Sequence, residues 1–218
     1  MTRASFDLGL EQIHNDILTM GSIVEKQIFK CIEALANQDC DLAEKVIKDD
    51  DLVDNLQKVI ENKCVMLIAT QQPLAQDLRT IFTSIKIVTD LERIADHAVD
   101  ISKIAIRLKG QTYIKQLVHI PQMADIAKEM IKRSIDAYIE ADIEKAYSTC
   151  KMDDEMDTLY KEVLNELLLL MSEDATTVNQ SSQLLFVCKF LERVADHTTN
   201  ICEWTVYLVT GEQIDLND

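Results

Sequence analysis

The stretch LERIADHAVDI, residues 91–101, decides the fold, because it occurs a second time as LERVADHTTNI at residues 191–201. Seven of the eleven positions are identical at a constant offset of 100 residues, and they include a Glu, an Arg, an Asp and a His. Helix-forming bias alone would not reproduce these residue types in order. Repetition at a fixed offset is typical of a chain built from repeated structural units. We therefore expect two similar halves, residues 1–110 and 111–218.

Each half is expected to contain three helices, because apolar residues recur at every third or fourth position over long stretches. The pattern predicts helices over residues 6–36, 39–70 and 73–108 in the first half, and over 122–139, 142–171 and 176–210 in the second. Only four Gly and two Pro occur in 218 residues, which leaves few places to turn. Short connections force consecutive helices to run antiparallel. The expected fold is all-α, a tandem repeat of two antiparallel three-helix bundles.

The formal net charge of −16 limits the classes of partner. It argues against a nucleic acid and against attraction to an anionic lipid surface, but it permits cation binding. No apolar run reaches the ~20 residues of a membrane span, and no N-terminal segment has the basic region followed by an apolar core that a signal sequence would show. We expect a cytoplasmic protein without direct membrane insertion. Its six cysteines include no C-x-x-C pair and are expected to be reduced.

Acidic pairs spaced by four residues recur on two helices of each half. Glu92 and Asp96 fall within an apolar stripe that includes Ile81 and Val88, where a solvated charge would not be expected. Glu192 and Asp196 repeat this arrangement. The preceding helix carries a D-x-x-x-D pair in each half, at an offset of 103 residues. Each bundle therefore brings two inward-leaning acidic pairs together: Asp50, Asp54, Glu92 and Asp96 in the first half, and Asp153, Asp157, Glu192 and Asp196 in the second.

Converging carboxylates favour a cation site, because burying several like charges costs several kcal/mol unless protons or a cation compensate. Oxygen ligands suit magnesium, calcium, manganese or iron, and zinc is compatible with them. Asp100 extends the first acidic row, whereas its counterpart Asn200 is a neutral and weaker ligand. The alternative is that the carboxylates lie at the bundle rim, where water, Arg93 or Lys58 satisfies them.

The histidines and arginines of the repeat have other expected roles. His97 and His197 follow the aspartate by one residue, about 100° around the helix, so they are expected to face away from the acidic rows. Ala95 and Ala195 occupy the positions at which a di-iron bundle would place its histidine. Arg93 and its counterpart in the second half are expected to pair with nearby acids.

No sequence motif indicates a reaction. A phosphate-binding glycine loop, a nucleophile elbow and a metalloprotease signature are all absent from the sequence. A metal-binding protein that is not an enzyme is the leading hypothesis from the residues alone. Two alternatives are a carboxylate-bridged metalloenzyme in a helical bundle and a purely structural helical adaptor without metal.

The chain resembles the PhoU family of phosphate-uptake regulators over nearly its whole length. The resemblance rests on ILTMGSIVEKQI at residues 17–28, DDLVD at 50–54, QPLAQDLR at 72–79 and the doubled LER motif. It implies a cytoplasmic negative regulator of phosphate uptake and phosphate-regulon signalling. The implied partners are the ATPase of the phosphate ABC transporter and a phosphate-sensing histidine kinase, and the implied assembly is a homodimer. It also implies iron or zinc clusters on the paired acidic motifs named above.

Overall fold

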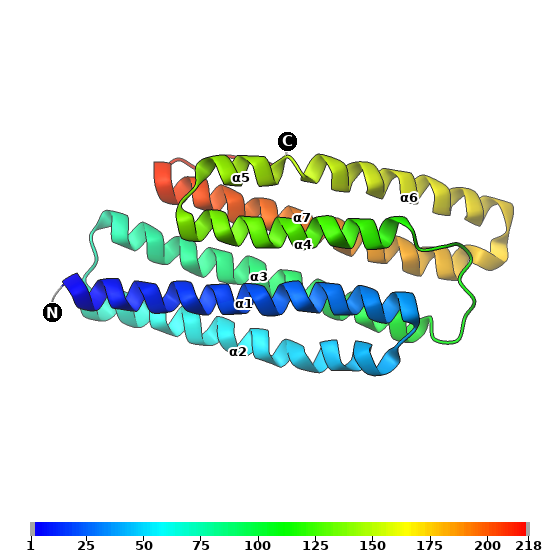
Figure 1. Cartoon of the computed structure of the whole chain (residues 1–218), viewed down its shortest axis with the longest axis horizontal. Helices are drawn as coiled ribbons and strands as arrows, with labels where there is room; N and C mark the ends of the chain where they lie inside the picture. Colours follow the sequence, from blue (N-terminus) through cyan, green and yellow to red (C-terminus); the bar gives the residue numbers. More distant parts are fainter. Residues whose placement is uncertain (1–2, 217–218) are drawn as a thin grey trace.

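Long helices that lie side by side along the molecule make up almost the whole chain (Figure 1). The computed structural model describes residues 3–216, which contain no β-strand. The seven α-helices are α1 (Arg3–Asn37), α2 (Cys40–Gln71), α3 (Ala75–Arg107), α4 (His119–Glu140), α5 (Ile143–Cys150), α6 (Asp153–Glu173) and α7 (Val178–Thr210), and a 3-10 turn, η1 (Ala175–Thr177), precedes the last.

The helices form two antiparallel three-helix bundles, as the repeat predicts. α1, α2 and α3 pack on one another in the first bundle, and α4 and α7 pack with the α5–α6 pair in the second (Figure 1). The bundles meet where α3 packs against α7 and α1 packs against α4. The all-α prediction is confirmed. The division at residue 110 stays a prediction.

The first turn of each bundle is built in the same way. Gln38 and Ala141 adopt left-handed conformations with φ of 53° and 51°, and each is followed by an aspartate that caps the next helix. Asp39 accepts a hydrogen bond from the backbone N–H of Leu42 at 3.0 Å, and Asp142 accepts one from Lys145 at 2.9 Å. A side-chain oxygen at this position satisfies a helix N–H that otherwise lacks a partner. The second predicted helix, over residues 39–70, thus starts with Asp39 as its N-cap.

The predicted continuous helix over residues 142–171 is wrong, because it is broken between Cys150 and Asp153. The chain tightens there into bonds of the 3-10 type, such as the one from the Met152 N–H to the Thr149 carbonyl at 3.0 Å. The Ser148 and Thr149 hydroxyls both donate to the Lys145 carbonyl, at 2.9 and 2.8 Å. Hydroxyl groups that bond the preceding turn compete with the helix ladder and bend it.

Other helix ends differ from the predictions by a few residues. α3 begins at Ala75, so Pro73 precedes the helix instead of lying in its first turn. α4 begins at His119, which places Pro121 inside its first turn. Proline is tolerated at this point because a first-turn N–H has no intrahelical acceptor. Gly211 ends α7 with a left-handed φ of 82°, as expected.

The main apolar core runs through both bundles. It includes Ile17 and Ile28 from α1, Leu91 from α3, Ile131 from α4 and Val194 from α7, all buried. α1 and α4 pack tightly at Gly21, where an added Cβ would lie 2.1 Å from Cδ1 of Ile135. Only glycine leaves room for this contact.

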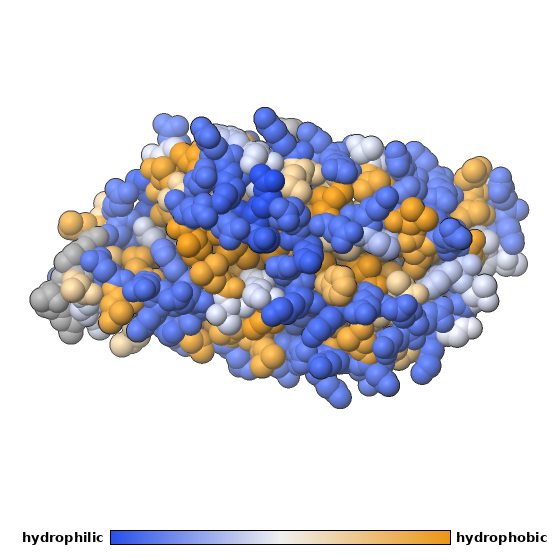
Figure 2. Space-filling model, in the orientation of Figure 1, coloured by the Kyte–Doolittle hydropathy of each residue, from blue (hydrophilic) through white to orange (hydrophobic). Residues whose placement is uncertain are grey.

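The surface is largely polar and the cysteines are free thiols. On the face that carries α1 and α4, hydrophilic side chains predominate and apolar ones show in small patches (Figure 2). None of the helices within residues 3–216 is long and apolar enough to cross a membrane. The six cysteines are unpaired, as predicted, and four of them are buried: Cys31, Cys64, Cys188 and Cys202.

Candidate functional site

Four carboxylates meet between α2 and α3 to form the first acidic cluster, Asp50, Asp54, Glu92 and Asp96. Burial and the negative charges of Asp54, Asp96 and Glu92 together raise the pKa of Asp50 from its ordinary value to about 6. Burial, followed by the charge of Asp96, also raises the pKa of Glu92. The two acidic pairs predicted for this half therefore lie close together in the structure.

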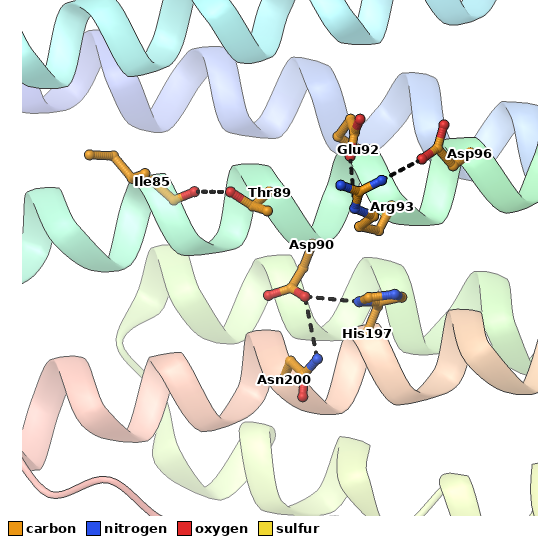
Figure 3. A network of polar contacts seen from close by, with 8 residues as sticks. All are labelled: Ile85, Thr89, Asp90, Glu92, Arg93, Asp96, His197 and Asn200. Atoms are coloured by element: carbon orange, nitrogen blue, oxygen red, sulfur yellow. Dashed lines mark hydrogen bonds and ion pairs between the residues drawn. The ribbon is translucent and has the colours of Figure 1, made fainter.

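Arg93 offsets part of this negative charge. Its guanidinium donates to Asp96 Oδ2 at 2.9 Å and lies 3.5 Å from Glu92 Oε2 (Figure 3). Glu92 Oε2 is buried and makes no hydrogen bond within residues 3–216. A buried acceptor without a donor costs about 1–3 kcal/mol. Arg93 pairs with the acids as predicted, but part of the negative charge of the first acidic cluster is left uncompensated.

The second acidic cluster lies between α6 and α7 and consists of Asp153, Asp157, Glu192 and Asp196. Burial and the charges of Asp196, Asp157 and Glu192 raise the pKa of Asp153 to about 6. The pKa of Asp196 is raised by burial and then by Glu192. Oδ1 of Asp153 is buried and lacks a hydrogen-bond partner among residues 3–216. The two clusters thus share both the convergence of carboxylates and an oxygen without a donor.

The cations of the second cluster differ from those of the first. Lys189 pairs with Glu192, and Lys161 pairs with Asp157 at 2.8 Å. Arg193 was predicted to hold the acidic row, and this prediction is wrong: no ion pair to it is found within the described part of the chain. It lies near His97 instead, and its charge helps to lower the pKa of that imidazole.

Asp100 and Asn200, the remaining predicted ligands, lie on the side of the helices where α3 meets α7. Asp100 pairs with Lys103 at 2.9 Å and lines a groove with Phe190. Asn200 donates to Asp90 Oδ1 at 3.3 Å (Figure 3). Eight residues along a helix amounts to a rotation of about 80°, which turns these side chains away from Glu92 and Glu192. The structure therefore brings eight of the ten predicted ligands together in two clusters and places two elsewhere.

The histidines face the junction of α3 and α7, away from the acidic clusters as predicted. His97 is buried and stacks on Phe190 with ring centroids 5.4 Å apart. Burial, followed by the charges of His197 and Arg193, lowers its pKa to about 4. His197 Nδ1 lies 2.9 Å from Asp90 Oδ1 (Figure 3).

Sequence reasoning missed Asp90, which joins the two bundles through these contacts with α7. Its counterpart in the second repeat is Phe190, so comparison of the repeats gave no signal for this position. Asp90 is buried and projects from α3 on the side opposite Glu92 and Asp96 (Figure 3). The polar link between the bundles is therefore separate from both acidic clusters.

The donor chemistry of the clusters fits a hard cation, but the side chains do not form a closed cage. Carboxylate oxygens are the ligands that such cations prefer, and each cluster has a buried oxygen without a hydrogen-bond donor. Within residues 3–216, however, no three His, Cys, Asp or Glu side chains stand close enough together to hold an ion. The clusters in this arrangement are facing pairs, and side-chain rotation would be needed to enclose an ion.

Fold and site together define a class of all-helical proteins with two three-helix bundles and an acidic cluster in each. A family model described as "PhoU domain" matches residues 17–105 and 120–205. The chain belongs to the PhoU family.

Similar proteins cover the whole chain. A Clostridium acetobutylicum protein named "Phosphate-specific transport system accessory protein PhoU homolog" is 56% identical over 219 residues, 100% of both chains. The crystal structure of PhoU from Pseudomonas aeruginosa is 34% identical, with a TM-score of 0.91 over 95% of this chain and 100% of its own. PhoU from Streptococcus pneumoniae is 32% identical, with a TM-score of 0.90 over 96% of this chain and 99% of its own.

Proposed function

We propose that this protein is an accessory protein of a phosphate-specific transport system that lowers phosphate uptake and phosphate-regulon signalling when phosphate is plentiful. The observation that carries the proposal is the 56% identity, over full length, to a relative named as an accessory protein of phosphate-specific transport. In this proposal it acts in the cytoplasm, as a homodimer, on the transporter ATPase and on a phosphate-sensing histidine kinase. It regulates these proteins by contact and catalyses no reaction of its own.

We also propose that each acidic cluster binds metal ions, with iron or zinc as the first candidates and magnesium or manganese as alternatives. The raised pKa values of Asp50 and Asp153 support this part of the proposal, since they result from burial and then from neighbouring negative charge, and a bound cation would offset both. A bound metal ion would supply positive charge that offsets the carboxylates. Glu92 and Asp153 would contribute the oxygens that have no hydrogen-bond donor. Their cluster neighbours would complete the ligand set, and Asp100 and Asn200 would not take part.

The regulatory role is tested in cells that lack the gene. Deletion is expected to raise phosphate uptake and phosphate-regulon expression in phosphate-rich medium, and the wild-type gene is expected to restore both to normal. Unchanged uptake and expression in the deletion strain, with the transporter present, would count against the proposal. Measuring phosphate-regulon expression and phosphate uptake in the same cells distinguishes an effect on the histidine kinase from an effect on the transporter.

Metal binding is tested on protein purified without chelator, by counting ions per chain. Replacing Glu92 by Gln and Asp96 by Asn should lower the metal content to that of the second cluster alone. The matched control replaces Asp125 by Asn and Glu129 by Gln, which have the same spacing on an exposed face of α4. Wild-type protein that carries fewer than about one ion per chain and gains no melting temperature from added metal would support the metal-free adaptor instead.

A further inference from the structure

α3 and α7 pack against each other across the two bundles, and the repeat makes their positions equivalent at an offset of 100 residues. The junction therefore has two ends with corresponding residues. One end holds the N-terminal half of α3 and the C-terminal half of α7, and the other holds the remaining halves (Figure 1). Comparing equivalent positions at the two ends shows which side chains differ between the repeats.

At the first end, rings and charges find partners within the chain. Trp204 makes an edge contact with Phe82, with centroids 5.8 Å apart, and Lys86 Nζ lies 5.4 Å from the centre of the Trp204 ring. The guanidinium of Arg79 lies 5.6 Å from the centre of the Tyr207 ring. Cations over aromatic faces at these distances are attracted by the ring electrons.

At the second end, the corresponding positions form a groove that the chain leaves open. We call it the basic–aromatic groove, and it is lined by Asp100, Lys103, Ile104, Arg107, Gln183, Phe186 and Phe190. Phe186 and Phe190 stand where the other end has Lys86 and Asp90, and Arg107 stands where it has Tyr207. The second end therefore carries its aromatic rings and its arginine at different positions from the first, and the cation–ring pairs of the first end have no counterpart at these positions.

Two groups in the basic–aromatic groove lack a matching partner. Phe186 is 54% exposed, and the one ring contact that it makes within residues 3–216 is the stacking on Phe190, with centroids 6.3 Å apart. Arg107 is exposed and donates to the neutral Oε1 of Gln183 at 3.3 Å, and no carboxylate pairs with it within residues 3–216. Lys103 is the contrasting case, because Asp100 pairs with it at 2.9 Å.

The chemistry of the groove specifies what would fill it. An apolar side chain would cover the exposed ring of Phe186, and a carboxylate would match Arg107 through a paired hydrogen-bond geometry that guanidinium favours. A positive groove on a chain of net charge −16 also limits the partner to a locally acidic one. Exposed aromatic residues next to arginine are typical of the centres of protein interfaces.

We infer that the basic–aromatic groove docks a segment with an apolar side chain beside a carboxylate, carried by a protein of the phosphate transport system. The inference rests on the proposed function for the identity of the partner. Beyond the proposed function, the inference specifies the docking surface and the chemistry of the bound segment. It also explains why this surface occurs at only one end of the α3–α7 junction.

The test measures binding of the purified full-length protein to the assembled phosphate transporter in nanodiscs. Arg107→Glu and Phe186→Asp are each expected to weaken binding about tenfold or more, as for residues at the centre of an interface. Both residues are exposed, so neither variant should disturb folding. The matched controls are Lys132→Glu on α4 and Leu169→Asp on α6, which change an exposed lysine and a leucine that is 57% exposed. Both controls should bind like the wild type.

The outcomes separate the docking surface from the proposed function. If the wild type and both groove variants bind the transporter equally well, the groove is not the docking surface. The proposed function would then remain intact. No binding of the wild type to the transporter overturns the groove together with its assigned partner. Equal binding to empty nanodiscs that contain anionic lipid would also overturn the inference, because the groove would then recognise lipid. Loss of binding in both groove variants, with both controls unchanged, supports it.

Discussion

Replacing Asp50 by Asn is expected to stabilise the metal-free protein at neutral pH. Asp50 has a pKa of about 6 in the folded protein against an ordinary value of 3.8. This difference is equivalent to about 3 kcal/mol at about 1.4 kcal/mol for each pH unit. Water screens part of it because Asp50 is only half-buried, so we expect a gain of about 1.5 kcal/mol. For a chain of this size the melting temperature should rise by about 3–6 °C.

The pH dependence of this gain follows from the raised pKa. Folding is penalised where Asp50 is ionised in both the folded and unfolded states, so the full penalty applies above pH 6. As the pH falls from 6 to 3.8, the folded protein takes up the proton first and the penalty fades. Below 3.8 the aspartate is neutral in both states and the variant should have no advantage.

The assay is urea unfolding in the presence of a chelator at a series of pH values from about 4 to 8. Asp125→Asn, at an exposed position of α4, is the control and should change stability by less than about 0.5 kcal/mol. A variant less stable than wild type at pH 7.5, or a gain that persists unchanged at the acidic end, would refute the account of the first acidic cluster. With metal added the sign should reverse, because a proposed ligand is lost.

Three further substitutions test the packing. Gly21→Ala would push a methyl group against Ile135 and should lower the free energy of unfolding in urea by about 1–3 kcal/mol. An unchanged urea midpoint would mean that α1 and α4 move apart at little cost. Asp142→Ala removes the cap of α5 and should lower stability by about 1 kcal/mol, with loss of helical circular dichroism no larger than one turn. Asp90→Ala leaves the His197 contact unmade and should cost about 1–3 kcal/mol, seen as a lower melting temperature.

The predictions from sequence succeeded where the repeat and the helix period reinforced each other. The apolar stripe around Glu92 and its copy around Glu192 fixed which faces are buried, and this placed eight carboxylates in two clusters. The same helical projection placed Asp100 wrongly in the acidic row. Residues spaced by four are slightly rotated relative to one another around the helix, and this rotation accumulates over eight residues. Angular error of this kind grows with distance from the residue used as the reference.

Other features depend on interactions that the apolar pattern does not record. The break after Cys150 follows a turn in which the Ser148 and Thr149 hydroxyls bond the Lys145 carbonyl, and such local bonds do not interrupt the spacing of apolar residues. The role of Asp90 depends on a helix from the other repeat. Arg193 differs from Arg93 because Lys189 already neutralises Glu192. Each case is decided by a neighbour distant in sequence or by local hydrogen bonding.

The shared core has a consequence for what happens when the chain is cut between its halves. The connection after α3 is itself bonded to both bundles: Tyr113 donates to the Leu35 carbonyl, and the Ile114 N–H donates to Gln180 Oε1 at 2.6 Å. Because α1 and α3 bury apolar surface against α4 and α7, the fragments would resemble the subunits of an obligate dimer. A protease that nicks this connection should leave two pieces that migrate together until denaturant separates them.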